Sequence, residues 1–235
     1  SFDNDALNKI SLSIEKIRLY LIKFLQIRSM NNANVIIFLS KFSKRVISKY
    51  LKKNINSSVI YHGIENDINI LGKKNIINTS WDYKLKKKIK IVYVSPLFLY
   101  KNHITVVKAY SRLKKKYNNL EIKFVGNYKN NLKLFKNILT ENSVLNERNF
   151  TGQLNRKDVL KILTQSDIFV FASSSETFGI TLLEGMAIGM PIVCSNKSSL
   201  PEILDNGGIY FDPKNDLQLF KKIDLLIRNK KLRKT

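Results

Sequence analysis

The sequence predicts an α/β protein built on an open parallel sheet that helices cover on both faces. Two patterns along the 235 residues support this prediction. Short, continuous apolar runs are typical of buried parallel strands, and segments whose apolar residues recur every three or four positions are typical of helices. The two patterns alternate with short connections along most of the chain, as they do in proteins with parallel sheets.

Residues 1–62 have the pattern of the end of an α/β domain. Residues 7–28 carry one apolar helical stripe, which in our interpretation packs on its own domain, although a helix on a membrane surface has the same pattern. A strand in "NVIIFLS", a helix in "SKFSKRVISKYL" and a strand in "SSVIYHGI" follow. We expect the chain to be a fragment, because the beginning of this pattern is absent.

Residues 63–88 are rich in Asn and Lys and show no clean period, which indicates a segment connecting two domains. From residue 89 the alternation resumes and predicts a second domain, 89–235. Its strands are predicted at Ile89–Val94, Leu120–Gly126, Arg148–Thr151, Asp167–Ala172, Pro191–Ser195 and Gly208–Phe211. Its helices are predicted at Asn102–Lys116, Asn131–Thr140, Arg156–Gln165, Phe178–Ile188, Leu200–Asp205 and Asp216–Asn229.

The formal net charge is +23, from 41 basic and 18 acidic residues. Such a charge favours a polyanionic partner, for example nucleic acid, an anionic membrane or a phosphorylated substrate. An AT-rich genome explains the charge equally well, because Lys, Asn and Ile are abundant and the lysines are spread in short clusters. A nucleic-acid-binding module is therefore an alternative from a different class. Against it, the sequence has no RNA-recognition aromatic motif, helix-turn-helix pattern or basic helix.

The single cysteine, Cys194, lies in the apolar run "PIVCS" and is predicted to be a small core residue. One cysteine forms no disulfide within the chain, which favours a reducing cytoplasm. No apolar run approaches the roughly 18 to 20 residues that span a bilayer, and "SFDNDALNK" does not have the form of a signal peptide. We expect a cytoplasmic protein whose basic clusters in residues 1–62 allow peripheral contact with an anionic inner membrane face.

The stretch "SSSETFGITLLEGMAIGMP" places two carboxylates, Glu176 and Glu184, eight positions apart. A helix that begins near Thr177 presents its first N–H groups and the positive end of its dipole to an anion, typically phosphate. On such a helix Glu184 lies about 10 Å along the axis from Thr177 and nearly on the same face. Carboxylates at the two ends can accept hydrogen bonds from sugar hydroxyls. Alternatively, Glu176 is a helix cap and Glu184 a solvated residue, but the apolar neighbours of Glu184 favour a function.

This stretch resembles the signature of the retaining glycosyltransferases of family four, the group 1 transferases of GT-B fold, in which E-x7-E precedes a small-residue helix and G-x-P-V. The surrounding order is similar too, in "SVIYHGIE", "IVYVSPLFLYKNH", "LEIKFVGN", "NFTGQLNRKDVLKILTQSDIFVFASSSE" and "SLPEILDNGGIYFDP". The resemblance covers about Val35 to Asp216. It implies a sheet of Rossmann-like type, with residues 1–62 as the end of an acceptor-side domain and residues 89–235 as the domain that binds a nucleotide sugar.

The resemblance also implies roles for individual residues. Glu176 matches the residue that contacts the donor sugar, and Glu184 matches the one that binds the ribose hydroxyls. Lys101, in "YKNH", matches the lysine that grips the diphosphate; the family's usual Arg five positions earlier is Pro96 here. The backbone N–H groups of Phe178, Gly179 and Ile180 match those that bind the sugar and the distal phosphate, and Gly152, Gln153 and Leu154 match the seat of the base.

The function implied is transfer of a sugar from a nucleoside-diphosphate sugar to a glycan or lipid-linked acceptor of surface polysaccharide, with retention of configuration. The departing phosphate then takes the acceptor proton, and neither a metal nor a further cofactor is expected. The alternatives are a nucleotide-sugar epimerase or a phosphorylase of the same fold, and a non-catalytic remnant that still binds nucleotide. We expect His62 and His103 to have structural or solvent-facing roles, and this fragment to be inactive alone.

Overall fold

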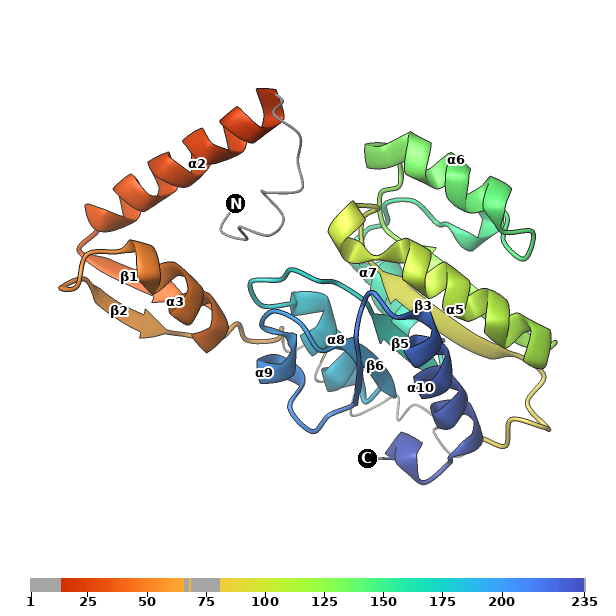
Figure 1. Ribbon diagram of the computed structural model, residues 1–235. Coiled ribbons are helices and arrows are strands. Elements are labelled where there is room, and N and C mark those ends of the chain that lie inside the picture. The colour runs from red at the N-terminus through yellow and green to blue at the C-terminus, as the bar shows by residue number, and fades with distance from the viewer. Residues whose placement is uncertain (1–13, 66–67, 69–80, 235) are drawn as a thin grey trace. The chain divides into compact units, whose positions relative to one another are not determined.

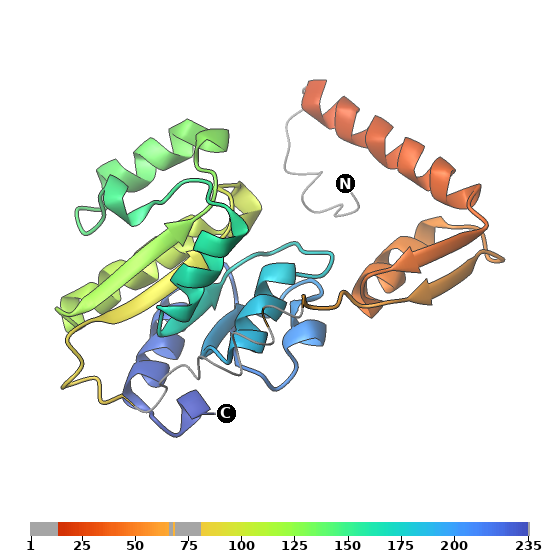
Figure 2. The same cartoon turned by 180° about the vertical axis from the view of Figure 1, so that it is seen from behind.

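The computed structural model describes residues 14–65, 68 and 81–234 (Figures 1 and 2). The chain divides into two compact units, Ser1–His62 and Gly63–Thr235, and each is an α/β structure. None of the described helices is long and apolar enough to cross a bilayer.

The first unit contains one pair of parallel strands. Its elements are α2 (Ile14–Asn31), β1 (Val35–Phe38), α3 (Lys41–Ile47), a 3-10 helix (Ser48–Tyr50) and β2 (Asn56–Val59). Helix α3 begins after Ser40 because the side-chain oxygen of Ser40 accepts a hydrogen bond from the N–H of Ser43 at 3.0 Å. The strands and the second helix predicted for this part are confirmed, and residues 7–13 of the predicted first helix lie outside the described residues.

Helix α2 exposes much of its apolar stripe. The side chains of Ile17, Leu21, Phe24 and Leu25 are each more than half exposed. The described residues leave much of this stripe uncovered, so its packing on its own domain stays a prediction.

The second unit contains a five-stranded parallel sheet in the order β4-β3-β5-β6-β7 (Figure 1). Its strands are β3 (Ile89–Val94), β4 (Leu120–Val125), β5 (Ile168–Phe171), β6 (Ile192–Ser195) and β7 (Ile209–Phe211). Parallel strands bring all their carboxyl ends to one edge of the sheet, so the loops that follow them meet there.

Helices cover both faces of this sheet, as the sequence predicts (Figures 1 and 2). Alternate side chains of β3 point to opposite faces, with Ile91 and Tyr93 in one apolar core and Val92 in the other. The first core is closed by α5 (His103–Lys116), α6 (Leu132–Glu141) and α10 (Asp216–Arg228). The second is closed by α7 (Arg156–Thr164), α8 (Ile180–Ile188) and α9 (Leu200–Leu204), and it contains Cys194, fully buried as predicted.

The strand predicted at Arg148–Thr151 is wrong. This part is a 3-10 helix, Glu147–Asn149, followed by one isolated parallel bridge from Phe150 to β4. The side-chain oxygens of Asn146 and Asn149 cap the turn by accepting backbone N–H groups at 3.0 and 2.9 Å. These side chains compete with strand pairing, so only the single bridge forms beside β4, which is the outer strand of the described sheet.

The segment predicted to connect the two domains contributes to the core of the second unit. Ile68 is fully buried in the second core, and Trp81 is 7% exposed in the first. The guanidinium of Arg233 lies 3.7 Å from the centroid of the Trp81 ring and donates a hydrogen bond to the C=O of Trp81. The parts of residues 63–88 that the structure describes therefore belong to the second unit.

Candidate functional site

The loops that follow β3 and β5 are joined at the carboxyl edge of the sheet. The N–H of Ser174 donates to the C=O of Tyr100 at 2.8 Å. The side-chain amide of Asn102 donates to the C=O of Ala172 at 2.8 Å and to the hydroxyl of Ser174 at 2.6 Å. Asn102 has a φ of 53°, in the left-handed region that Asn adopts more readily than most residues, and it precedes α5 directly. One side chain thus clamps two loops together.

The clamp brings Lys101 against Glu176. The ammonium Nζ of Lys101 donates a hydrogen bond to Oε1 of Glu176, and the two side chains are only 12% and 16% exposed. The backbone of Lys101 is anchored as well, because the hydroxyl of the fully buried Tyr93 donates to its C=O at 2.5 Å. The two residues predicted to act in catalysis are therefore an ion pair, although 75 positions separate them.

A third loop, after β6, holds the backbone of Glu176. The hydroxyl of Ser198 accepts a hydrogen bond from the N–H of Glu176 at 2.9 Å and donates to its C=O at 2.5 Å. The hydroxyl of Ser199 lies 3.1 Å from the same C=O and 3.3 Å from that of Phe178. The loops after β3, β5 and β6 thus meet at Glu176, whose carboxylate contacts Lys101 and whose backbone contacts Ser198.

Helix α8 begins at Ile180, two residues later than predicted. Gly179, the residue before it, has a φ of 97°, which stops the helix from extending back to Phe178. Phe178 is buried and Ile180 is 47% exposed. The axial distance of about 10 Å expected between Thr177 and Glu184 does not apply, because it assumed one helix through both residues.

Glu184 lies in the second turn of α8 and forms an ion pair that the sequence analysis missed. Nη2 of Arg156 lies 3.0 Å from Oε1 of Glu184, and Nη1 of Arg156 lies 3.2 Å from Oε1 of Glu65. Glu184 is only 8% exposed, and this burial raises the pKa of its carboxyl group. Arg156 acts to lower that pKa and Glu65 to raise it, but burial has the larger effect.

The turn predicted to seat a base leads directly into Arg156. Gly152 has a φ of 75°, and its C=O accepts a hydrogen bond from the N–H of Gly126 at 3.0 Å. Leu154 packs partly buried against the second core, two residues before Arg156. A Cβ at Gly126 would lie 2.3 Å from the C=O oxygen of Ser95, so only glycine allows the end of β4 this close to the loop after β3.

The predicted site residues thus fall into two groups. Lys101 and Glu176 pair at the ends of β3 and β5, while Glu184 pairs with Arg156, which follows the turn of Gly152 and Leu154 in the chain. No hydrogen bond or ion pair in the described part of the chain directly joins Lys101 or Glu176 to Arg156 or Glu184.

Residues 75–235 match the family model of the glycosyl transferases, group 1. The chain belongs to this family. Over 206 residues it is 29% identical to an uncharacterized glycosyltransferase of Methanocaldococcus jannaschii, covering 86% of this chain and 51% of that protein. Over 80 residues it is 38% identical to the N,N'-diacetylbacillosaminyl-diphospho-undecaprenol alpha-1,3-N-acetylgalactosaminyltransferase of Campylobacter jejuni, covering 33% and 21%.

Among solved structures, that of HepE from Anabaena in complex with UDP and glucose is similar, with a TM-score of 0.71 and 17% identity over 89% of this chain and 60% of HepE. Such similarity confirms the predicted α/β fold of GT-B type. The chain spans about half the length of the two uncharacterized glycosyltransferases of Methanocaldococcus jannaschii that it matches over 206 residues.

Neither histidine of this group 1 glycosyltransferase chain lies in the two groups of site residues. His103 is 2% exposed, with its ring centroid 4.8 Å from that of Tyr93. Burial lowers the pKa of His103 to about 3, and its Nδ1 has no hydrogen-bond partner among the described residues. His62 is exposed. His103 is therefore a neutral, buried side chain at neutral pH, and the roles expected of both histidines stay predictions.

The loop after β3 also presents two aromatic rings beside Lys101. Phe98 and Tyr100 stack with 5.7 Å between their centroids, and they remain 37% and 45% exposed. On the loop after β6, Lys197 pairs with Asp212 at 3.1 Å. The basic side chain that contacts Glu176 is that of Lys101.

Sequence reasoning missed Arg156, Asn102 and Ser198. Arg156 carried one usable signal, since it follows the turn 152–154 directly and is the first residue of α7. Asn102 and Ser198 have left-handed φ values of 53° and 63°, which no sequence pattern around them indicated. Their roles depend on which loops meet in the folded chain.

Proposed function

We propose that this chain is the donor-binding part of a retaining glycosyltransferase, which moves a sugar from a nucleoside-diphosphate sugar to an acceptor. The observation that carries the proposal is the pair of Lys101 and Glu176 at the carboxyl edge of the parallel sheet. Ligands of open α/β sheets bind at this edge. A cation suits a diphosphate there, and a carboxylate suits the hydroxyls of a sugar.

Donor binding exchanges the contacts of this pair. The ammonium of Lys101 leaves Glu176 for the diphosphate oxygens, and Glu176 accepts hydrogen bonds from the sugar to be transferred. The backbone N–H groups of Phe178, Gly179 and Ile180, at the start of α8, bind the sugar and the distal phosphate, aided by the helix dipole. The ion pair therefore keeps both side chains ordered until the donor replaces it.

The nucleoside end of the donor binds at the second group of residues. The carboxylate of Glu184 accepts hydrogen bonds from the two ribose hydroxyls, while Gly152 and Leu154 contact the base. Arg156 favours the ionised form of Glu184, which is the form that accepts hydrogen bonds from both hydroxyls. Arg156 is a positioning residue in this arrangement, since it acts through Glu184.

In the reaction, the bond between the anomeric carbon and the phosphate oxygen breaks, and a bond from the acceptor oxygen to the same carbon forms. The acceptor proton passes to the departing phosphate, and the sugar keeps its configuration. Lys101 stabilises the negative charge that develops on the leaving diphosphate. Glu176 orients the sugar and is not a nucleophile. The proposal includes neither a metal ion nor a further cofactor.

Two comparisons support the classes of donor and acceptor. HepE was solved with UDP and glucose, and the relative from Campylobacter jejuni is named for a diphospho-undecaprenol acceptor. We accordingly propose a nucleoside-diphosphate sugar as the donor and a glycan or lipid-linked saccharide of surface polysaccharide synthesis as the acceptor. The reaction would take place in the cytoplasm, with peripheral contact at the anionic inner face of the membrane.

The test is calorimetric titration of this chain with UDP, GDP and their sugar conjugates. We expect Lys101→Ala and Glu184→Ala to weaken binding at least tenfold, and Lys115→Ala, an exposed lysine on α5, to leave it unchanged. If the chain is well folded and binds none of these nucleotides, the proposal is wrong. Turnover belongs to the full-length protein, because we expect this part to be inactive alone. Assays of transfer, epimerisation and phosphorolysis there separate the transferase from an epimerase or a phosphorylase.

A further inference from the structure

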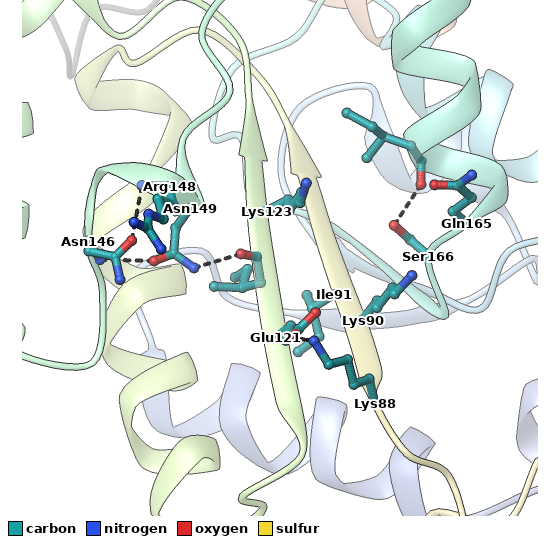
Figure 3. Close-up of a pocket in the computed structure, with 12 residues that line it drawn as sticks. Lys88, Lys90, Ile91, Glu121, Lys123, Asn146, Arg148, Asn149, Gln165 and Ser166 are labelled. Atoms are coloured by element: carbon teal, nitrogen blue, oxygen red, sulfur yellow. Dashed lines mark hydrogen bonds and ion pairs between the residues drawn. The ribbon is translucent and has the colours of Figure 1, made fainter.

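A concave site lies toward the opposite end of the sheet from Lys101 and Glu176. It is a groove of about 440 Å³ over the beginnings of β3 and β4, between the 3-10 helix Glu147–Asn149 and the end of α7 (Figure 3). Along the strands its lining reaches Ile91 and Lys123, short of the strand ends at Val94 and Val125, and it includes no residue of the loops that carry Lys101 and Glu176. The groove is therefore no part of the proposed donor site.

The groove carries a strong excess of positive charge. Four cations line it, Lys88, Lys90, Lys123 and Arg148, against one carboxylate, Glu121. Glu121 is already paired with Lys88 at 2.5 Å. The side chains of Lys90, Lys123 and Arg148 have no acidic partner in the described part of the chain. We call these three residues and the cavity they line the basic groove.

The strand register brings two of the three cations close together. Lys90 is the register partner of Glu121, and Lys123 lies two residues further along β4 on the same face. With strands about 4.8 Å apart and same-face residues about 6.6 Å apart along a strand, the Cα atoms of Lys90 and Lys123 are separated by about 8 Å. The two side chains therefore lie on one face of the sheet, near enough for a single anion to contact both ammonium groups.

The third cation stands on a rim that is fixed by hydrogen bonds. The N–H of Arg148 donates to Oδ1 of Asn146 at 3.0 Å, and the amide of Asn149 donates to the C=O of Ile122 in β4 at 3.0 Å. On the opposite side, Gln165 lies at the end of α7 (Figure 3). The groove therefore has two walls and a basic floor, unlike lysines spread over a convex surface.

The lining points to the class of ligand. A volume of about 440 Å³ is within the range of small-molecule sites. None of the described residues that line the groove is aromatic, so it offers no ring for the base stacking that single-stranded nucleic acid uses. We propose that the basic groove binds an anion carrying two or more phosphate groups, independently of the nucleotide sugar. Its source is a soluble phosphorylated molecule or a phosphorylated lipid head group.

The probe for the soluble source is tripolyphosphate. It is titrated calorimetrically near physiological salt, with UDP present to occupy the proposed donor site. We expect saturable binding that weakens at least tenfold in Lys90→Ala/Lys123→Ala/Arg148→Ala. The matched control, Lys115→Ala/Lys221→Ala/Lys230→Ala, removes three exposed positive charges elsewhere and should change the affinity less than twofold. Lys123→Ala/Arg148→Ala, which alters only exposed side chains, repeats the test if the triple variant unfolds.

Flotation with vesicles of phosphatidylcholine, with and without phosphatidylinositol bisphosphate, tests the lipid source with the same variants. Loss of flotation in the groove variants but not in the control supports a lipid head group. Equal weakening of both probes in the groove and control variants would overturn the proposal, because it would show diffuse attraction by the net charge. Absence of saturable binding of either probe by the unaltered chain would overturn it too.

Discussion

Arg156, the first residue of α7, lies 3.0 Å from the buried carboxylate of Glu184 in α8 and 3.2 Å from that of Glu65. The pair joins two helices that cover the same face of the sheet. Burial alone would disfavour the negative charge of Glu184 in this pair. Because Glu184 is the residue proposed to bind the ribose, the state of its proton controls whether it can accept hydroxyl hydrogen bonds.

Removing Arg156 should make nucleotide binding more dependent on pH. In Arg156→Ala the pKa of Glu184 rises further, because the cation that lowers it is gone. Relative to the unaltered chain, the affinity of this variant for UDP should then fall about three- to tenfold more near pH 5.5 than near pH 8. The reason is that, below the pKa of Glu184, each unit of increase in that pKa lowers the ionised fraction of Glu184 about tenfold. Lys157→Ala, the neighbouring exposed cation, should keep the unaltered profile in the same titrations. Parallel profiles for the two variants would contradict this role of Arg156.

The stability of the fold should also respond to Glu184. Burial raises the pKa of Glu184 in the folded state, so the folded chain holds this proton more tightly than the unfolded chain does. The stabilising contribution is therefore complete below the unfolded pKa and is lost as pH rises to the folded one. Urea unfolding should show Glu184→Gln gaining stability relative to the unaltered chain as pH rises above about 4, the ordinary pKa of a glutamate. The exposed Glu141→Gln should show no such gain, and a constant difference for Glu184→Gln would refute the sign.

Substitutions of the two members of the ion pair, Lys101 and Glu176, should have opposite effects on UDP binding. Lys101→Ala should weaken UDP by about ten- to a hundredfold, which corresponds to losing a hydrogen bond to a charged group worth roughly 1.5–3 kcal/mol. Glu176→Gln should strengthen UDP about two- to tenfold, because no ion pair must break, and should abolish any preference for UDP-sugar over UDP. Glu141→Gln serves as the control in these calorimetric titrations. Equal losses in both variants would mean that the pair is only structural.

Two substitutions of Asn102 should separate the contribution of its side-chain hydrogen bonds to stability from that of its backbone conformation. Asn102→Gly loses the bonds to Ala172 and Ser174 but tolerates the φ of 53°, and should cost about 1–3 kcal/mol of unfolding free energy. Asn102→Ala should cost about 1 kcal/mol more, because alanine disfavours the left-handed region. Urea unfolding measures both values. If alanine is tolerated better than glycine, the backbone of residue 102 does not need this conformation.

Two glycines with positive φ should differ sharply in their tolerance of alanine, because only one of them also lacks space for a Cβ. At Gly126 a Cβ would lie 2.3 Å from the carbonyl oxygen of Ser95, whereas at Gly189, with a φ of 78°, nothing lies within 4 Å. Gly189→Ala should therefore cost about 1–2 kcal/mol from its φ alone. Gly126→Ala adds a backbone collision and should cost at least about 2 kcal/mol more by urea unfolding. Similar costs for the two variants would show that the loop after β3 moves away freely.

Much of the fold followed from local patterns. The runs at Ile89–Val94 and Leu120–Gly126 became β3 and β4 within one residue, because apolar strands with turns at both ends have few other buried arrangements. The helix ends were shifted where one residue had an unusual conformation, as at Gly179 before α8. The strand predicted at Arg148–Thr151 failed because capping by Asn146 and Asn149 outweighed the strand propensity of an apolar neighbour.

The candidate site divides in the same way. The spacing of Glu176 and Glu184 and the position of Lys101 were visible in the sequence, because they depend on residue type and on the order of motifs. The pairing of Lys101 with Glu176 and of Arg156 with Glu184 was not visible, because each pair joins elements that only the folded sheet brings together.

By itself, then, the sequence determined the α/β class, most of the order of its elements and the segment that holds two carboxylates around the start of a helix. The tertiary structure alone decided which charges meet. The physical reason is that periodicity and turn chemistry act over a few residues, while an ion pair depends on loop closure. Here the closure rests on the Asn102 clamp, on the hydroxyl of Ser198 and on the close approach at Gly126.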